Sequence, residues 1–370
     1  MSLPFASPPA SRGTEPPQFR RVSPHDVRSA VVEFFWRQRA WPYPDLESYY
    51  RYWDWRYSSL SEESPVVWIA IDGERVVGHI AVYFRRHRVA GRTVRVGVPG
   101  NFLVDPTHRD TMIGARLASS PRALVRDGEV DVLLDYGNRI AHAMFVRLGA
   151  RDLGFMKSFV EVRQWAPVLS RRIPGGAALA PLARVANAMR KALPGINPPP
   201  ARKEFDVREL DAHALRRIDR SHWSVPSDCV IEDATPAYLA NRFLGCPVRQ
   251  HRVFGVVDRA SEALEGLVVT EGSARVKVWA CEVNDSALSE SEAVHLAISR
   301  MAGVESVLVP LLPRSNVAKA FARAGFLRER FMDDVEANTS WSAYWRDSHP
   351  LAANFADLAS WKLWYSWSHH

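Results

Sequence analysis

The order of predicted strands and helices in the first half of this 370-residue chain recurs in the second half. Two β-branched runs, 66–71 and 75–84, flank the turn dipeptide Asp72-Gly73, which predicts a hairpin. A second hairpin is predicted over 252–270, and in each half a buried strand and a helix come later. An internal repeat of a whole domain is the simplest explanation, because a chain of this length can bury two cores.

Two clusters rich in proline and glycine, RIPGG and LPGINPPP, separate the halves. They enclose an amphipathic stretch at 179–193, which predicts a linker over 166–204 with one helix. The remaining ranges are a disordered leader at 1–18, a first domain at 19–165, a second domain at 205–345 and an aromatic tail at 346–370. The tail tryptophans are expected to pack across the domain junction or to line an acceptor cleft.

Composition limits the classes of partner and site. The formal net charge of +7 favours an anionic partner such as a phosphorylated cofactor, nucleic acid or an acidic membrane surface, without choosing among them. No window approaches the roughly 18 uninterrupted apolar residues of a membrane-spanning helix. Cys229, Cys246 and Cys281 form no CxxC pair and have no histidine set at metal-ligand spacing. We therefore expect reduced thiols in the cytoplasm and no metal site.

Helix signals surround the first hairpin of the chain. Ser23 is predicted to cap a helix that runs to Arg37, and Asp45 is predicted to cap an aromatic helix over 44–57. In the second half, residues 208–218 are predicted to form a helix equivalent to the first. The aromatic helix is expected to pack against the edge of a sheet.

The predicted strand at 94–104 contains Pro99, Gly100 and Asn101. Proline cannot donate to the ladder and glycine often marks a bulge, so this strand is expected to splay from its neighbour. A strand N–H at the splay would point at a bound carbonyl group. Asn101 either orients a substrate or only tolerates an unusual backbone conformation.

Residues 104–117, VDPTHRDTMIGARL, follow this strand. They resemble the cofactor loop of the GNAT acyltransferase superfamily, V-x-P-x-x-R-G-x-G-I-G-x-x-L. The matching residues are Val104, Pro106, Arg109, Ile113, Gly114 and Leu117. Backbone N–H groups that open a helix can cradle the pyrophosphate of coenzyme A. Asp110 and Met112 replace two glycines of the family.

A second motif, NRIAHAMFVRLGA at 138–150, resembles N-x-x-A-x-x-x-Y-x-x-L-G-F of the same superfamily. There the asparagine, here Asn138, helps to position the pantetheine arm, and the tyrosine commonly protonates the departing thiolate. Phe145 stands at the tyrosine position and cannot donate a proton. Either another group such as Tyr136 or His142 serves as the acid, or the thiolate leaves unassisted.

The resemblance implies an α/β fold with two tandem GNAT-like domains, each a mixed, mostly antiparallel twisted sheet flanked by helices. Residues 19–165 have motif support, whereas 205–345 have only the element order. Because the loop at 282–292 lacks the glycine signature, the second domain is expected to be degenerate and to bind no CoA. The expected cofactor-binding residues are Phe102, Leu103, Val104, Arg109, Asp110, Thr111, Met112, Ile113, Gly114, Ala115, Asn138 and Phe145.

The implied activity is an acyl-CoA-dependent N-acyltransferase that moves an acyl group from acetyl-CoA or another acyl-CoA to an amine of a small-molecule or sugar acceptor. Such chemistry needs a proton acceptor, a held amine and a polarised carbonyl. Asp135 and Tyr136 end a predicted strand, where ligands of open α/β sheets bind. Asp135 is the first candidate base, Tyr136 and His142 are the other catalytic candidates, and Asn101 is the substrate-binding candidate.

Two other functions stay open at this stage. The chain could be a catalytically silent acyl-CoA sensor, because Phe145, Asp110 and Met112 depart from the motifs. It could also resemble the tandem-domain transferases that use aminoacyl-tRNA, but those should lack a CoA-type loop. Nucleic acid is therefore not the expected partner, and the sequence leaves open the acyl chain length, the acceptor and the oligomeric state.

Overall fold

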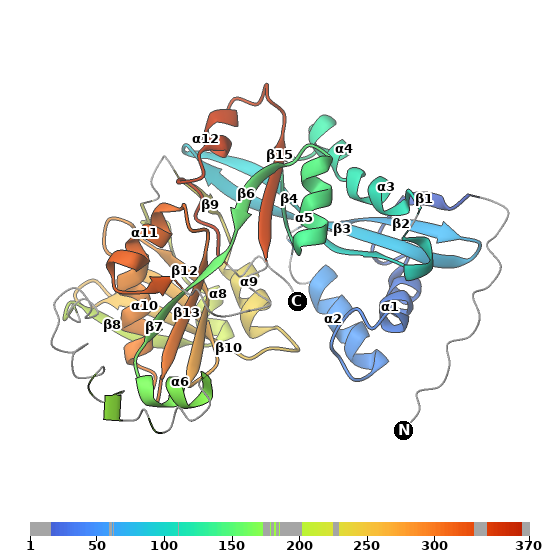
Figure 1. Ribbon diagram of the computed structural model, residues 1–370. Coiled ribbons are helices and arrows are strands. Elements are labelled where there is room, and N and C mark those ends of the chain that lie inside the picture. Colours follow the sequence, from blue (N-terminus) through green and yellow to red (C-terminus); the bar gives the residue numbers. More distant parts are fainter. Residues whose placement is uncertain are drawn as a thin grey trace.

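Two mixed β-sheets organise the chain, and helices flank both (Figure 1). The computed structural model describes residues 16–58, 61, 63–109, 111–172, 178, 181–182, 185, 202–224, 229–328 and 339–364. Most of the predicted leader, most of the predicted linker helix at 179–193, and Asp110 lie outside these residues. The predicted fold class is confirmed.

The first sheet has the strand order β1-β2-β3-β4-β5-β15-β6, and β9 pairs with the end of β3. Neighbouring strands in this sheet are antiparallel, except that β4 and β5 are parallel. The strands are β1 (Gln18–Val22), β2 (Val66–Asp72), β3 (Arg75–Val89), β4 (Arg92–Val104), β5 (Val132–Gly137), β6 (Arg151–Phe155), β9 (Val230–Glu232) and β15 (Ser340–Trp345).

The parallel strands β4 and β5 separate soon after they meet. They pair only at Val96 with Val132 and at Gly97 with Leu133. The register of β4 against β3 shifts in the segment opposite Gly100, and Asn101 has a φ of 54°. A non-glycine residue with positive φ is uncommon and typical of bulges and turns. The predicted splay at 99–102 is therefore confirmed.

Helices cover both faces of the first sheet. One face carries α1 (Arg28–Arg37) and α2 (Leu46–Ser58), and the other carries α3 (Ile113–Ser119), α4 (Arg122–Arg126) and α5 (Arg139–Arg147). Alternate residues of a strand point to opposite faces. Accordingly, Ala81 and Tyr83 of β3 pack on the α1–α2 side, whereas Ile80 and Val82 pack on the α3–α5 side.

Asp45 caps α2 as predicted, because its carboxylate accepts a hydrogen bond from the N–H of Ser48 at 2.7 Å. The prediction that Ser23 caps the first helix is wrong. Ser23 Oγ accepts from the N–H of His25 at 3.3 Å, which closes only a turn, and α1 begins at Arg28.

The second sheet has the strand order β14-β7-β13-β12-β11-β10-β8, and β12 and β13 are its parallel pair. The strands are β7 (Lys157–Val162), β8 (Phe205–Leu210), β10 (His251–Asp258), β11 (Leu264–Glu271), β12 (Arg275–Val283), β13 (Ser306–Leu311) and β14 (Leu327–Arg328). The helices of this half are α6 (Trp165–Arg172), α8 (Ala212–Arg216), α9 (Pro236–Leu239), the π-helical turn η3 (Ala240–Leu244), α10 (Glu290–Ser299), α11 (Asn316–Arg323) and α12 (Ala352–Ala356).

The predicted helix at 208–218 needs correction. Residues 208–210 belong to β8, which pairs with β10, and the helix α8 begins only at Ala212. Asp211 caps it by accepting a hydrogen bond from the N–H of Ala214 at 2.7 Å. The cap separates the strand from the helix.

The two halves exchange strands: the second half gives β9 and β15 to the first sheet, and the first half gives β7 to the second. β6 and β7 follow each other directly, but β6 lies in the first sheet and β7 lies in the second, between β13 and β14 (Figure 1). In return, β15 from the second half lies between β5 and β6. Each predicted domain therefore gives a strand to the sheet of the other. Trp361 and Trp364 of the predicted tail are buried, and so are Trp341 and Trp345 of β15.

Candidate active site

The loop that follows β4 leads into α3. Asp105 starts the 3₁₀ turn η1 (Pro106–His108) by accepting a hydrogen bond from the N–H of Thr107 at 3.0 Å. Met112, at the start of α3, is 76% exposed and offers no side-chain cap. Among the described residues, the first helical N–H, that of Ile113, has only a long 3.4 Å contact with Thr111 Oγ1. Backbone donors at this helix start are thus open to an anionic ligand.

Gly114 lies in the first turn of α3, against the end of β4. A Cβ atom placed on Gly114 would be 3.9 Å from the side chains of Phe102 and Val104, which is ordinary contact. Arg109 is exposed beside this turn. The predicted loop residues therefore lie together at one end of β4, and they leave room next to Gly114.

The second predicted motif forms the start of α5. The side-chain oxygen of Asn138 accepts hydrogen bonds from the N–H groups of Ile140 and Ala141 at 3.1 and 3.0 Å, so Asn138 is the helix cap. Phe145 is buried in the apolar cluster between α3, α5 and the sheet. Ile140 is 82% exposed at the same helix start.

Asp135 faces the α3–α5 side of the sheet, in a small pocket lined also by Pro99, Phe145 and Ser342. It is 5% exposed, and its hydrogen-bond partner is the hydroxyl of Ser342 at 3.4 Å. Burial raises the pKa of Asp135 to about 8, and the bond from Ser342 opposes this only weakly. Since burial disfavours the charged form, this carboxyl holds its proton near neutral pH.

The other two catalytic candidates do not join Asp135. Tyr136 points to the opposite face of the sheet, where its ring lies 5.5 Å from that of Trp341. His142 is buried on α5, with its Nε2 3.2 Å from the carboxylate of Asp152 and its ring 5.3 Å from that of Phe155. The structure therefore separates the three candidates.

A buried polar network lies on the α1–α2 side of the splay. Asn101 Nδ2 donates hydrogen bonds to the hydroxyl oxygens of Tyr57 and Tyr83 at 2.8 and 3.0 Å. The backbone oxygen of Asn101 lies 2.8 Å from His79 Nδ1. Because a carbonyl oxygen only accepts, Nδ1 carries the proton and Nε2 faces the Tyr57 hydroxyl at 3.4 Å. These bonds hold the bulge of β4 in place.

The protonation states in this network follow from burial. Burial lowers the pKa of His79 to about 4, so the imidazole is neutral at pH 7. Burial raises the pKa of Tyr83 to about 12, although the guanidinium of Arg56 opposes the shift. Arg56 donates to Tyr83 Oη from Nε at 2.9 Å and to Tyr52 Oη from Nη1 at 2.7 Å. Tyr83 is therefore neutral at pH 7, and Arg56 is the charge of the network.

Sequence reasoning named Asn101 but missed the rest of this network, although one signal for it was present. Tyr52 and Arg56 are four residues apart, so they lie on the same face of α2. An arginine on an otherwise aromatic, buried face needs a polar partner inside the protein. Tyr83 and His79 lie on β3, so no pattern within α2 indicates that they join the network.

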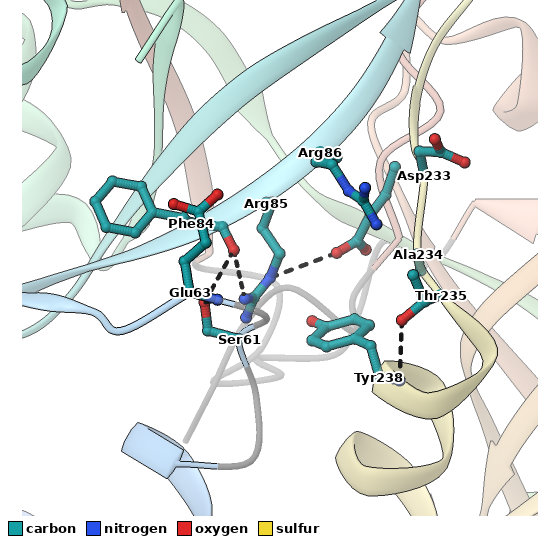
Figure 2. Close-up of a pocket in the computed structure, with 10 residues that line it drawn as sticks. Ser61, Glu63, Phe84, Arg85, Arg86, Asp233, Ala234, Thr235 and Tyr238 are labelled. Carbon is teal, nitrogen blue, oxygen red and sulfur yellow. Dashed lines mark hydrogen bonds and ion pairs between the residues drawn. The ribbon is translucent and has the colours of Figure 1, made fainter. Parts of the chain in front are cut away.

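A second pocket lies where the halves meet, between the end of β3 and α9 (Figure 2). Arg85 is 3.4 Å from Glu232 and lies over the ring of Tyr238, 4.7 Å from its centroid. Burial raises the pKa of Glu232, and Arg85 and Arg242 oppose that rise. This pocket contains paired charges from both halves and no residue of the predicted site.

The described residues contain no group of three or more His, Cys, Asp or Glu side chains that could hold a metal ion. Within the same part of the chain, no helix has the length and apolar character needed to cross a membrane.

Comparison with known families gives one match. Residues 29–150 match the family described as the acetyltransferase (GNAT) family. The matched range runs from α1 to the end of α5 and so contains both helix layers, the splay and the loop. Among curated protein sequences, none matches this chain.

Solved structures share the fold over both halves. A GCN5-related N-acetyltransferase from Anabaena variabilis has a TM-score of 0.56 at 10% identity, covering 88% of this chain and 72% of that one. A probable N-acyltransferase from Enterococcus faecalis has a TM-score of 0.54 at 7% identity, covering 90% and 73%. Saccharomyces cerevisiae N-myristoyltransferase with bound myristoyl-CoA has a TM-score of 0.51 at 10% identity, covering 91% and 84%.

Proposed function

We propose that this chain, a GNAT-type acyltransferase through its domain at residues 29–150, transfers an acyl group from a CoA thioester to an amine of a small-molecule acceptor by direct attack. The observation that carries the proposal is the opening between β4 and β5. The loop before α3 lies at one end of this opening, and the Asn101 network lies on the α1–α2 side. A thioester that enters from the loop could thus meet an amine on the opposite face.

The cofactor is acetyl-CoA or another acyl-CoA in this proposal. The backbone N–H groups at 110–115 would hold the pyrophosphate, with Arg109 as a charged contact. The strand end Phe102 to Val104 would run beside the pantetheine arm. The exposure of Arg109 and the missing cap at Met112 support this assignment.

Asp135 is the proposed general base. Its pKa of about 8 lies near a physiological operating pH, where a general base is most effective. The carboxyl lies in the pocket that also contains Pro99, at the start of the splay. Tyr136 and His142 are the alternatives. Because Phe145 cannot donate a proton, the departing thiolate takes one from another group or leaves unassisted.

The test is acetyl-CoA binding by calorimetry, followed by thiol release in the presence of a panel of amines, amino sugars and amino acids. We expect one binding site per chain and thiol release that depends on an amine. Absence of acetyl-CoA binding would overturn the proposal.

An acyl-CoA sensor is the second candidate function. Phe145, buried where the family commonly has a tyrosine, supports it. A sensor would bind acetyl-CoA but release no thiol with any amine of the panel. Cys229, Cys246 and Cys281 form no disulfide in the part of the chain that the structure describes, which supports a reducing, cytoplasmic location for either function.

A further inference from the structure

Arg56 is a buried cation without a carboxylate partner. It is 1% exposed, and its hydrogen-bond acceptors are the hydroxyl oxygens of Tyr52 and Tyr83. Among the residues that the structure describes, no Asp or Glu lies within ion-pair distance of it. Removal of a guanidinium from water is costly unless an opposite charge is present. A missing anion would explain why this arginine is inside the protein.

The free end of Arg56 lies beside the splay. Its Nη2 is 3.4 Å from the position that a Cβ atom on Gly100 would take. Nη2 has no hydrogen bond with any described residue. Because residue 100 is a glycine, the strand comes close to the guanidinium without a side chain between them. The unused donor therefore lies at the part of β4 that leaves β5.

The second half contains the same pair with an anion added. Arg242 is also buried, and its Nη1 donates to the hydroxyl of Tyr238, four residues earlier, at 2.7 Å. This matches the bond from Arg56 to Tyr52 in spacing and length. Glu232 forms its ion pair with Arg85 at 3.4 Å, but it also lines the same small cavity as Arg242, whose charge opposes the rise in the pKa of Glu232. A carboxylate thus shares a cavity with Arg242, whereas among the described residues none forms an ion pair with Arg56.

We infer that the amine acceptor carries a carboxylate and that Arg56 binds this carboxylate. The inference rests on the proposed function, and it makes the acceptor an amino acid rather than an amino sugar. The carboxylate would take the place that Glu232 has beside Arg242. In the transfer, the acceptor nitrogen bonds to the acyl carbon and the carbon–sulfur bond breaks. The thiolate takes up a proton to become CoA thiol, and the proton lost from the ammonium group passes to Asp135 or to solvent.

The test compares acceptors with and without a carboxylate. The pairs are glycine and glycinamide, L-alanine and L-alaninamide, and L-phenylalanine and L-phenylalaninamide, each with acetyl-CoA, and glucosamine is the amino sugar without a carboxylate. For at least one pair, the wild type should favour the acid by roughly ten- to hundredfold in kcat/KM, mainly through KM, as expected for a charge-assisted bond. Arg56→Gln should remove the preference, and Arg56→Lys should keep part of it.

Arg242→Gln is the matched control, because it removes a buried guanidinium from the same Tyr–Arg pair in the other half. It should leave the ratio of acid to amide unchanged. Equal acceptance of acid and amide by the wild type would overturn the inference, and so would a preference that survives in Arg56→Gln. An equal loss on both members of each pair would assign Arg56 to structure alone. Thermal unfolding and acetyl-CoA binding of each variant show whether it is folded.

Calorimetric titration of the same acids and amides separates this inference from the proposed function. If an acid binds through Arg56 but no thiol is released, the carboxylate site stands and the acyl transfer fails. If thiol release occurs with glucosamine or amides and no acid binds better than its amide, the transfer stands and the inference is wrong.

Discussion

The helices that follow β4 and β12 occupy equivalent places in the two sheets, but their first turns differ. α3 has no acidic residue in its first turn and no side-chain cap. α10 begins with a capping box in which Ser289 Oγ accepts from the N–H of Glu292, and the Glu292 carboxylate accepts from the N–H of Ser289. It also has Glu290 in its first turn. Since a capped and acidic helix start repels phosphate, of these two helix starts α3 is the better suited to an anion.

The strands β5 and β13, each the second strand of a parallel pair, also differ between the two halves. β5 has Asp135 and Tyr136 as its fourth and fifth residues, whereas β13 has Val309 and Pro310 there. All six residues of β13 are buried, and none of them titrates. Of these two strands, β5 in the first half thus has titratable groups near its carboxyl-terminal end, and β13 in the second half has none.

The second half still completes the candidate site of the first. Its strand β15 places Ser342 against the carboxyl of Asp135 and Trp341 against the ring of Tyr136. The first half thus combines an open helix start with a polar strand end. In the second half, a capping box and apolar side chains occupy the corresponding places, and this half gives β9 and β15 to the first sheet.

The change that tests the comparison most strongly is Gly114→Glu. A longer acidic side chain in the first turn of α3 would occupy and repel the pyrophosphate site, and the space around Gly114 lets the helix keep its fold. We expect acetyl-CoA binding to become undetectable by calorimetry. Ser289→Glu, at the start of α10, should cost roughly 1 kcal/mol of stability as a lost cap, with cofactor affinity unchanged. Two equivalent acetyl-CoA sites per wild-type chain would contradict the comparison.

The next change, Asp135→Asn, tests the polar strand end. Asparagine keeps the shape and removes the ionisable group, so turnover should fall about a hundredfold or more if Asp135 is the base. Acetyl-CoA affinity should be nearly unchanged. The wild-type rate should rise with pH up to about 8, where the Asp135 carboxyl loses its proton, and this rise should vanish in the variant.

Tyr136→Phe and His142→Ala are the controls for that assignment. Tyr136 lies on the opposite face of the sheet, and His142 is paired with Asp152, so each variant should lose less turnover than Asp135→Asn. If either variant abolishes turnover while Asp135→Asn stays active, the base is assigned to the wrong residue. If all three stay active, the enzyme works by positioning a neutral amine.

Local chemistry made much of the first half predictable. The hairpin around Gly73, the cap at Asp45 and the splay at Pro99 each follow from a turn, capping or ladder rule that acts within a few residues. The alternation of a strand also implies that Asp135 and Tyr136 face opposite ways, which the joint prediction of both as catalytic did not use.

Other features depend on contacts far apart in the sequence. The exchange of β7 and β15 was not predictable, because the pattern of a strand determines its faces and not its partner. The Arg56 network joins α2, β3 and β4, so no window of sequence contains it. The helix at 208–218 was predicted from propensity, and pairing with β10 overrode that propensity in its first residues.

A smaller effect is expected for Arg109→Ala, which separates the charged contact from the backbone cradle. If Arg109 contacts phosphate, CoA affinity should weaken by about 1–3 kcal/mol. Comparison of CoA with dephospho-CoA shows which phosphate is involved, because the variant should lose discrimination only for that group. Arg300→Ala, which breaks an exposed pair with Asp206 in the second half, is the control and should leave affinity unchanged. If Arg109→Ala does not change the affinity for CoA, the backbone N–H groups bind the phosphates without help from Arg109.

The smallest expected effect concerns stability and distinguishes a buried acid from an ion-paired one. The pKa of Asp135 is raised in the folded protein to about 8 from an ordinary value of 3.8, so the folded state binds the proton more tightly. Its contribution to stability is therefore fully present below pH 4 and is lost as the pH rises through 8. Asparagine does not ionise, so Asp135→Asn should raise the melting temperature relative to wild type at pH 8 and should change it least at pH 4.

The strand β13, which has Val309 at the equivalent place, provides the control. Val309→Ala should lower the melting temperature by the same amount at both pH values, because it removes only packing. A difference between Asp135→Asn and wild type that does not change with pH would mean that the carboxyl is solvated or paired in solution, and the assignment of Asp135 as a base with a raised pKa would fail with it.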